Sequence, residues 1–203
     1  MNVIVAVTGA SGSIYAKLLL DELHRFQSKG DVKQIDVIFS NNAKEVWKHE
    51  IVDELGQVHV EARLALAHPN AIYNNDDYNA PFASGSALYD VMFVCPCSMG
   101  TMGRIANGLS DTLISRAADV MLKERRKLIL AIRETPINLI HVNNMQTLAQ
   151  AGAIIAPASP SFYSNPKTIE EVAMTVVDRL LQLGGLNKEM YRWGDIGAYR
   201  LRF

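Results

Sequence analysis

The chain has 203 residues, of which 49% are hydrophobic and 20% are charged, and its formal net charge at pH 7 is −1. This composition is typical of one globular α/β domain and excludes a disordered, collagen-like or coiled-coil chain. The near-neutral charge argues against a nucleic-acid partner, because nucleic-acid-binding domains usually carry a basic excess. No apolar run reaches the ~20 residues that a helix needs to span a membrane.

The cysteines and the first residues of the sequence indicate a cellular compartment. Cys95 and Cys97 stand only two positions apart, so they cannot form an ordinary structural disulfide, and a secreted disulfide framework is excluded. The sequence enters an apolar run at Val3 without a basic segment before it, so no signal peptide is predicted. We therefore expect a cytoplasmic protein.

Short apolar runs, largely of β-branched residues, alternate with amphipathic stretches along the chain. Such runs are typical of strands buried on both faces of a parallel sheet. The pattern predicts a Rossmann-like (flavodoxin-like) α/β fold in a single domain, with a doubly wound, mostly parallel sheet. The predicted strands are residues 3–7, 35–39, 91–94, 128–132 and 153–156, and helical stripes at 14–26 and 172–183 end near glycines.

Two segments are less regular. Residues 55–89 are rich in proline, asparagine, aspartate and glycine, which predicts a loop-rich connection around a short strand at 58–60. The organised domain is expected to end at residue 186. The tail at 187–203 interleaves aromatic residues with arginines, and we expect it to pack on the site or on a neighbouring subunit.

The first predicted strand runs directly into Thr8-Gly9-Ala10-Ser11-Gly12-Ser13 and then a helix. A glycine turn between a strand and a helix directs backbone amides and a positive helix dipole at one point, which favours phosphate. A tight turn with a serine N-cap is the alternative. The turn does not fit G-x-G-x-x-G, and Ser40-Asn41-Asn42 lacks the carboxylate that holds the ribose of a nicotinamide dinucleotide. A cofactor without the adenosine half therefore fits better, and a nicotinamide oxidoreductase is disfavoured.

The strand at 91–94 ends in a second small, hydroxyl-rich turn, Pro96-Cys97-Ser98-Met99-Gly100-Thr101. In a doubly wound sheet this turn and the first one are expected to flank the switch point, where ligands collect. Two such turns predict a groove for a flat ring and its phosphate. Cys97 is interpreted as a small buried thiol rather than a nucleophile, because no basic residue stands near it in sequence.

Charged residues mark two further points. Lys123-Glu124-Arg125-Arg126 closes a helix expected to begin at Ser110-Asp111, and it is a solvated helix end or part of a site. Arg133-Glu134 follows the strand at 128–132. The two residues form either a structural ion pair or a site in which Arg133 binds a phosphate and Glu134 transfers a proton. Thr135-Pro136 is expected to cap and begin the next helix.

Two residues in the last third of the chain are ligand candidates. Tyr163 follows a proline-rich turn and carries a hydroxyl, and Arg179 is either a surface residue or a phosphate anchor. The five histidines show no spacing typical of metal ligands, so no metal site is predicted.

Together these residues resemble the UbiX-type flavin prenyltransferases, once described as aromatic-acid decarboxylases. The resemblance implies a flavoprotein domain at 1–186 that joins the dimethylallyl group of dimethylallyl phosphate to N5 and C6 of reduced FMN, without a metal. It also implies a homo-dodecamer, and a UbiD-type decarboxylase as the recipient of the prenylated FMN. The matching segments are 8–15, 40–43, 84–86, 96–101, 116–126, 133–136 and 157–163.

The resemblance also implies roles for single residues. Catalytic roles fall to Glu134, Lys123 and Ser11, and either Glu134 or the released phosphate moves the protons. Lys123 and Glu134 reach into the donor site, from the same or a neighbouring subunit. The FMN ligands are Gly9, Ala10, Ser11, Ser40, Ser98, Met99, Gly100, Thr101 and Arg133, and the dimethylallyl phosphate ligands are Tyr163, Arg179, Lys123 and Trp193.

Two other functions stay open. Flavin-dependent cysteine decarboxylases share the fold and a similar turn at 96–101, but they carry P-x-M-N-x-x-M-W where this chain reads Arg133-Glu134-Thr135-Pro136-Ile137-Asn138. The other alternative is a flavin-carrying subunit of a decarboxylase system that has no turnover of its own.

Overall fold

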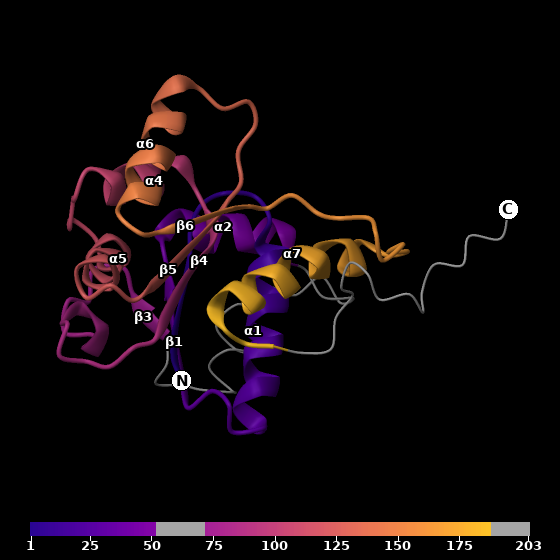
Figure 1. Cartoon of the computed structure of the whole chain (residues 1–203), viewed down its shortest axis with the longest axis horizontal. Coiled ribbons are helices and arrows are strands. Elements are labelled where there is room, and N and C mark those ends of the chain that lie inside the picture. The colour runs from indigo at the N-terminus through magenta and orange to yellow at the C-terminus, as the bar shows by residue number, and fades with distance from the viewer. Residues whose placement is uncertain (52–71, 188–203) are drawn as a thin grey trace, which may run out of the picture.

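The computed structural model describes residues 1–51 and 72–187, in which six parallel strands form one sheet between two layers of helices (Figure 1). The strand order is β3-β2-β1-β4-β5-β6, so the winding direction reverses between β1 and β4. The Rossmann-like, doubly wound fold is confirmed, and the switch point lies where it was expected. The strands are β1 (Asn2–Val7), β2 (Gln34–Phe39), β3 (Ile72–Asn74), β4 (Val91–Cys97), β5 (Lys127–Ile132) and β6 (Ile154–Pro157).

The helices divide between the two faces of the sheet. In the described ranges none of them is long and apolar enough to cross a membrane. One face carries α1 (Ser13–Ser28), α2 (Asn41–Glu50) and α7 (Ile169–Gly184), and the other carries α4 (Met99–Ala106), α5 (Leu113–Lys123), α6 (Leu139–Gln150) and a 3₁₀ turn, η1 (Pro81–Ala83).

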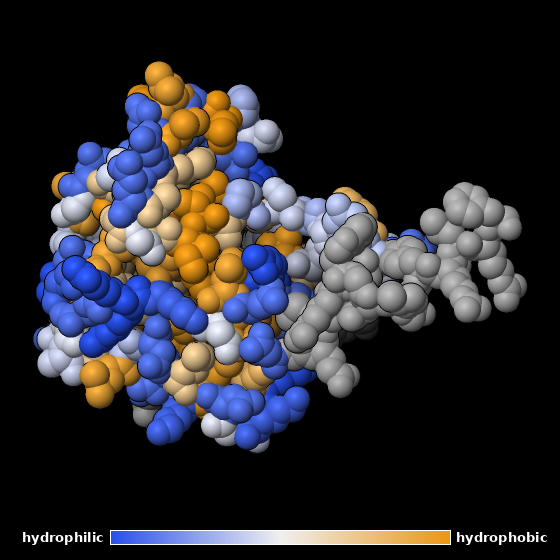
Figure 2. All heavy atoms as spheres, viewed as in Figure 1, coloured by the Kyte–Doolittle hydropathy of each residue, from blue (hydrophilic) through white to orange (hydrophobic). Residues whose placement is uncertain are grey.

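Helix α6 projects from the body of the domain (Figure 1). Leu148 is its one buried residue, whereas Leu139 and Ile140 are exposed by 72% and 67%. Apolar atoms gather at the projecting end of the helix (Figure 2). Ile137, just before the helix, is also exposed, so this end carries an uncovered apolar surface.

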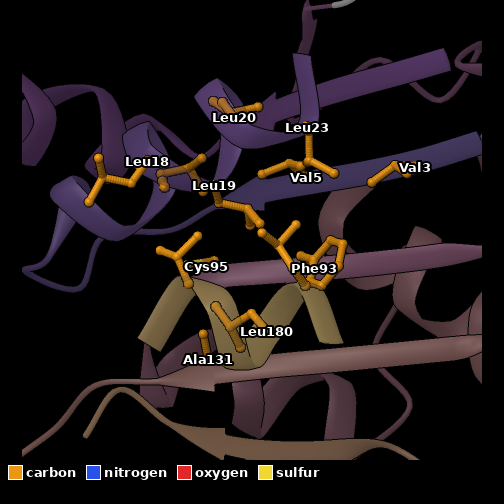
Figure 3. Packing of buried hydrophobic residues seen from close by; sticks show 14 of the residues in the cluster. Val3, Val5, Leu18, Leu19, Leu20, Leu23, Phe93, Cys95, Ala131 and Leu180 are labelled. Atoms are coloured by element: carbon orange, nitrogen blue, oxygen red, sulfur yellow. The ribbon is translucent and has the colours of Figure 1, made fainter. Parts of the chain in front are cut away.

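Strand alternation builds the two cores. Val3 and Val5 point toward α1 and α7, whereas Ile4 and Ala6 point toward α4 and α5, because successive side chains of a strand lie on opposite faces. Figure 3 shows the first core, in which residues of α1 and α7 pack on β1, β4 and β5. Both faces of the central strands are buried, and their parallel pairing brings their carboxyl ends together at one edge of the sheet.

The connection after α2 differs from the prediction. The strand expected at 58–60 lies outside the described residues, and the strand beside β2 is β3, in a stretch that was interpreted as loop. Phe82 of η1 packs edge-on between Tyr73 and Tyr89, with ring centroids 5.0 and 5.5 Å apart. Strand β3 has only three residues, and it is held by contacts with residues further along the chain. A strand this short leaves no alternating pattern of apolar residues in the sequence.

Two predicted helix starts are wrong, because reciprocal caps lie further along the chain. Helix α5 begins after Thr112, which forms a capping box with Ser115, and not at Ser110-Asp111. Helix α6 begins after Asn138, which forms one with His141, and not at Thr135-Pro136, whose peptide bond is cis. In each case the capping pair satisfies two backbone amides at once, which the earlier polar residues do not do.

Candidate functional site

Thr8 joins the carboxyl ends of β1 and β4 at the switch point. Its hydroxyl donates to the carbonyl oxygen of Pro96 at 2.7 Å and accepts from the amide of Ser98 at 2.8 Å. On the other side of β1, the amide of Ser40 donates to the carbonyl of Val7 at 3.0 Å. The two turns that the sequence singled out therefore lie next to each other.

Serine side chains cap two helices at this edge. Ser40 Oγ accepts from the amide of Ala43 at 3.1 Å at the start of α2, and Ser98 Oγ accepts from the amide of Thr101 at 3.4 Å at the start of α4. A Cβ on Gly9 would lie 2.6 Å from Asn42 Cβ, so α2 approaches β1 this closely only because residue 9 is glycine. The positive ends of α2 and α4 flank the turn after β1 and favour an anion.

Helix α1 does not begin with the serine N-cap that was the alternative interpretation of this turn. Its N-cap is Gly12, at φ +111°, and no side chain within the turn caps it. Instead Glu50, the last residue of α2, accepts from the amides of Gly12 at 2.9 Å and Ser13 at 2.7 Å. Burial raises the pKa of Glu50, but hydrogen bonds from the Ser11 hydroxyl and these amides outweigh it and hold the pKa below its usual value. Sequence reasoning missed Glu50, because nothing near it in sequence marks it.

Replacing Glu50 by Gln should lower the free energy of unfolding at pH 7 by about 0.5–1 kcal/mol, since a capping carboxylate is lost at a partly exposed site. Because the pKa of Glu50 is lower in the folded protein, its stabilisation is present above the unfolded pKa of about 4.5 and disappears as the pH falls through the folded value. Urea unfolding at pH 7 and at pH 3.5 should therefore show a smaller difference between variant and wild type in acid. Glu45→Gln, on the exposed face of the same helix, is the control and should lose less; an equal loss in both variants would contradict the cap.

A cavity of about 660 Å³ opens above the carboxyl ends of β1, β4, β5 and β6. Arg133 is bound at its backbone to the carbonyl of Cys97 (3.3 Å), and Ala158 to that of Ile132 (2.9 Å), so the segments after β5 and β6 continue the edge. Most of the lining is apolar, and its charged side chains are those of Arg133 and Glu134. The lining residues are Ser11, Gly12, Ile14, Tyr15, Met99, Ile132, Arg133, Glu134, Thr135, Ile137, Met145, Pro157, Ala158 and Ser159.

Arg133 and Glu134 lie side by side on the cavity wall but form no ion pair with each other. The Glu134 carboxylate accepts from the amide of Thr135 at 3.0 Å. Within residues 1–51 and 72–187 the guanidinium of Arg133 has no hydrogen bond or salt bridge. The interpretation as a structural ion pair is therefore wrong. Arg133 faces the cavity with no counter-ion from the described part of the chain, which suits an anion site.

The structure brings together part of the predicted site. Ser11, Met99, Arg133 and Glu134 line the cavity, and the other predicted FMN ligands lie in the adjoining turns at 8–13, 40–43 and 98–101. Tyr163 and Arg179 are exposed and are not part of the lining, and Arg179 donates to Gln182 on its own helix. Trp193 lies outside the described residues.

Lys123 also lies away from the cavity, at the end of α5. It pairs with Glu124 beside the loop 84–87, where Arg126 donates to the carbonyls of Gly85 at 2.9 Å and Ala87 at 2.6 Å. A Cβ on Gly85 would come within 2.7 Å of Lys123 Nζ, so this glycine lets the lysine lie against the loop. We call Lys123, Glu124, Arg126 and residues 84–87 the α5 cluster.

The two cysteines are buried on opposite faces of the sheet. Cys95 belongs to the α1/α7 core and Cys97 to the α4/α5 core, and both are free. Burial raises the pKa of Cys97 to about 12 and also raises that of Cys95. Both side chains are thus neutral thiols at pH 7, which fits the buried-thiol interpretation.

The comparisons with known proteins agree with this geometry. The family model Flavoprotein matches residues 1–183. Flavin prenyltransferase UbiX of Methanocaldococcus jannaschii is 43% identical over 197 residues, which cover 97% of this chain and 100% of the relative.

Solved structures are similar over the same length. AnUbiX (PadA1) in complex with FMN and dimethylallyl pyrophosphate has a TM-score of 0.81 at 37% identity, covering 95% of this chain and 98% of that one. A dodecameric FMN-dependent UbiX-like decarboxylase from Escherichia coli O157:H7 has a TM-score of 0.84 at 36% identity, with the same coverage. Cysteine decarboxylases reach TM-scores of 0.53 and 0.57 at 18% and 17% identity, which shows a common fold and no more.

Proposed function

The chain belongs to the Flavoprotein family and is a flavin prenyltransferase, and we propose that its cavity binds reduced FMN together with dimethylallyl phosphate. The reaction transfers the dimethylallyl group to the flavin, at N5 and C6, without a metal. The observation that carries this proposal is the Arg133 guanidinium, which has no partner among residues 1–51 and 72–187 and lines a largely apolar cavity close to the helix starts after β2 and β4. A flavin-dependent cysteine decarboxylase is the weaker alternative, because the chain is 43% identical to a flavin prenyltransferase and only 17–18% identical to the cysteine decarboxylases.

The residues at the switch point fit a flavin mononucleotide. Backbone amides of the turn at 9–11 and the capped starts of α2 and α4, at Ser40 and Ser98–Thr101, offer donors for the phosphate and ribityl chain. Arg133 offers a bidentate donor. Reduced FMN supplies the nucleophilic nitrogen that accepts the prenyl group, and the apolar lining from Met99 and Ile132 shields the ring from water.

For the prenyl donor, departure of the phosphate must be stabilised and a proton must be moved. Glu134 lies on the cavity wall and accepts the proton in our proposal. Tyr163 and Arg179 belong to the segments after β6, on the α1/α7 side, and we propose that they turn toward the donor phosphate when it binds. A hydroxyl and a guanidinium would then stabilise the leaving anion.

Lys123 is also proposed to act on the donor phosphate, and a second copy of the chain must then supply it. In its own subunit it lies in the α5 cluster, outside the cavity lining. The uncovered apolar end of α6, with Ile137, Leu139 and Ile140, borders the cavity and offers a surface for another subunit. We propose a homo-dodecamer, as in the E. coli neighbour, in which the α5 cluster of one subunit meets the cavity of another.

Mixed oligomers test this arrangement. Lys123→Ala and Glu134→Gln chains, each nearly inactive alone, should regain activity when co-expressed, because some sites combine intact Glu134 from one chain with intact Lys123 from another. Random assortment gives about a quarter of wild-type activity in an equal mixture. Activity is measured after purification through two different affinity tags. A mixture no more active than the separate variants would show that both residues act within one chain.

The activity itself is tested by anaerobic mass measurement. Purified protein with reduced FMN and dimethylallyl phosphate should yield a flavin heavier by one five-carbon prenyl unit, and omission of the donor or the protein should yield unmodified FMN. Unmodified FMN in the complete reaction would reject the transferase and leave the flavin-carrying subunit. Carbon dioxide released from a cysteine-terminated peptide would instead support the decarboxylase.

We further propose that the prenylated FMN passes to a UbiD-type decarboxylase and that the reaction takes place in the cytoplasm. The reaction modifies the flavin and does not remove a carboxyl group, so another enzyme has to use the product. The free thiols of Cys95 and Cys97 suit a reducing compartment. Adding the reaction product to an apo-decarboxylase of that type should restore decarboxylation, whereas FMN alone should not.

A further inference from the structure

The loop 84–87 of the α5 cluster is held at both ends by residues outside it. Just before the loop, the carbonyl of Ala83 accepts from Nε of Arg116 at 3.0 Å. Just after it, the Tyr89 hydroxyl donates to the carboxylate of Asp36, and both of these side chains are buried. The loop therefore has a set place beside the end of α5, against which the charged residues of the cluster lie.

Helix α5 ends in a turn that directs Arg126 back onto this loop. The amide of Arg126 donates to the carbonyl of Met121 at 2.8 Å, as in a Schellman turn. Such a turn needs a left-handed residue just before Arg126, and Arg125 fills that place at φ +54°, where glycine is usual. Two nitrogens of the Arg126 guanidinium then donate to carbonyl oxygens of the loop, at 2.6 and 2.9 Å.

Gly85 decides where the Lys123–Glu124 ion pair lies. Lys123 Nζ is 2.5 Å from Glu124 Oε1. A Cβ on Gly85 would lie 2.7 Å from Lys123 Nζ and 2.8 Å from Glu124 Cδ, so the pair occupies the space of a side chain at this position. The φ of Gly85 is not left-handed, so this contact, and not the backbone conformation, requires the glycine.

The Lys123 ammonium stays accessible although it is held in place. Its side chain is 46% exposed, and in the described part of the chain its one hydrogen-bond partner is Glu124. The hydrogen bond and the charge of Lys123 hold the pKa of Glu124 below its usual value, so that carboxylate is an ionised anchor at pH 7. An ammonium group has three donors, so two remain for an oxyanion.

We propose that Gly85 and Arg126 are positioning residues for Lys123, which set the point on the loop 84–87 from which its ammonium meets the donor phosphate. This rests on the proposed function, in which Lys123 acts on the donor phosphate bound in the cavity of a second subunit. Neither Gly85 nor Arg126 touches the substrate. Ordering a long lysine side chain on binding costs conformational entropy, and a lysine already held on the loop avoids much of that cost.

Gly85→Ala tests the contact with little effect on folding. The added methyl group displaces only the ends of two exposed side chains, so the melting temperature should stay within about 2 °C of wild type. Single-turnover prenyl transfer at a low, fixed concentration of dimethylallyl phosphate should slow by about 10- to 100-fold, since misplacing a group by about 1 Å can cost that much. Gly103→Ala, which would meet only the Asn144 side chain at 3.4 Å, is the matched control and should leave the rate unchanged.

FMN affinity and the Arg126 variants separate positioning from a general defect. FMN affinity, from flavin fluorescence, should change by less than about threefold, because the loop 84–87 is not part of the cavity lining. Arg126→Gln loses both bonds to the loop and should slow transfer as Gly85→Ala does. Arg126→Lys keeps the charge without the fork, so its rate should lie between those of Arg126→Gln and wild type.

Combined variants show whether Gly85 acts through Lys123. In a chain that already carries Lys123→Ala, adding Gly85→Ala should change the transfer rate by less than about threefold. In equal mixed oligomers, Gly85→Ala chains co-expressed with Glu134→Gln chains should recover about a quarter of wild-type activity. With Lys123→Ala chains they should recover nothing, because no site then receives an intact Lys123 from a chain with an intact loop.

Three results would overturn the inference. They are a Gly85→Ala rate equal to wild type, a clear further loss when Gly85→Ala is added to Lys123→Ala, and recovery in mixtures of Gly85→Ala and Lys123→Ala chains. Loss of FMN affinity in step with the rate would also overturn it, because the loop would then act on the flavin. Absence of prenylated flavin from wild-type protein would instead reject the proposed function.

Discussion

Substituting Gln for Glu134 should slow prenyl transfer by about 10²- to 10⁴-fold while FMN remains bound, because a positioned general base typically contributes that much to the rate. The Glu134 carboxylate lies on the cavity wall, and the amide of Thr135 holds one of its oxygens at 3.0 Å. Glutamine has nearly the same shape and can still accept this hydrogen bond, but its amide cannot take a proton. The change therefore removes the proton acceptor and leaves the wall in place.

Single-turnover formation of prenylated FMN, followed by mass spectrometry under anaerobic conditions, gives the rate. Flavin fluorescence titration gives the affinity in parallel. Glu45→Gln is a matched control, since Glu45 pairs with Lys48 on the exposed face of α2 and is not part of the cavity lining. Weak FMN binding with a normal rate in the bound fraction would show that Glu134 binds the flavin and does not accept the proton. A normal rate and normal binding would assign the proton to the released phosphate.

The sequence predicted the parts of the site that depend on residues adjacent in the chain. The turn at 8–13 and the turn at 96–101 each follow a strand buried on both faces, so each could be placed at the carboxyl end of its strand. Parallel pairing then brings the two turns together, and the Thr8 hydroxyl bonds that join them follow from that arrangement. Arg133 could be placed by the same argument at the end of β5.

The parts that could not be predicted depend on contacts between distant segments. Glu50 reaches Gly12 because α2 returns along the sheet edge, 38 positions away in sequence, and no spacing in the chain records that approach. Lys123 lies outside the cavity because α5 ends beside the loop 84–87, a contact set by Gly85. The starts of α5 and α6 were misplaced because several polar residues in a row could each serve as a cap, and the reciprocal partner decides among them.

Replacing Arg133 by Gln should raise the dissociation constant of FMN by about 10- to 100-fold. Hydrogen bonds to a charged group are worth about 1.5–3 kcal/mol, and each 1.4 kcal/mol is a factor of ten in affinity. The guanidinium meets no acidic partner among residues 1–51 and 72–187, so its charge is available to an anionic ligand and no internal ion pair breaks when it is removed. Folding stability should therefore change little.

Fluorescence titration at two salt concentrations separates charge from shape. The wild-type affinity should fall more steeply with salt than that of the Gln variant, and Arg133→Lys should lie between them, since it keeps the charge without the bidentate fork. Lys17→Gln is the charge-matched control, because Lys17 pairs with Asp21 on the exposed side of α1 and is not part of the lining. Equal losses in the Gln and control variants would mean that Arg133 attracts the flavin only through the net charge of the protein. An unchanged affinity in the Gln variant would remove Arg133 from the flavin site and leave the donor phosphate as its ligand.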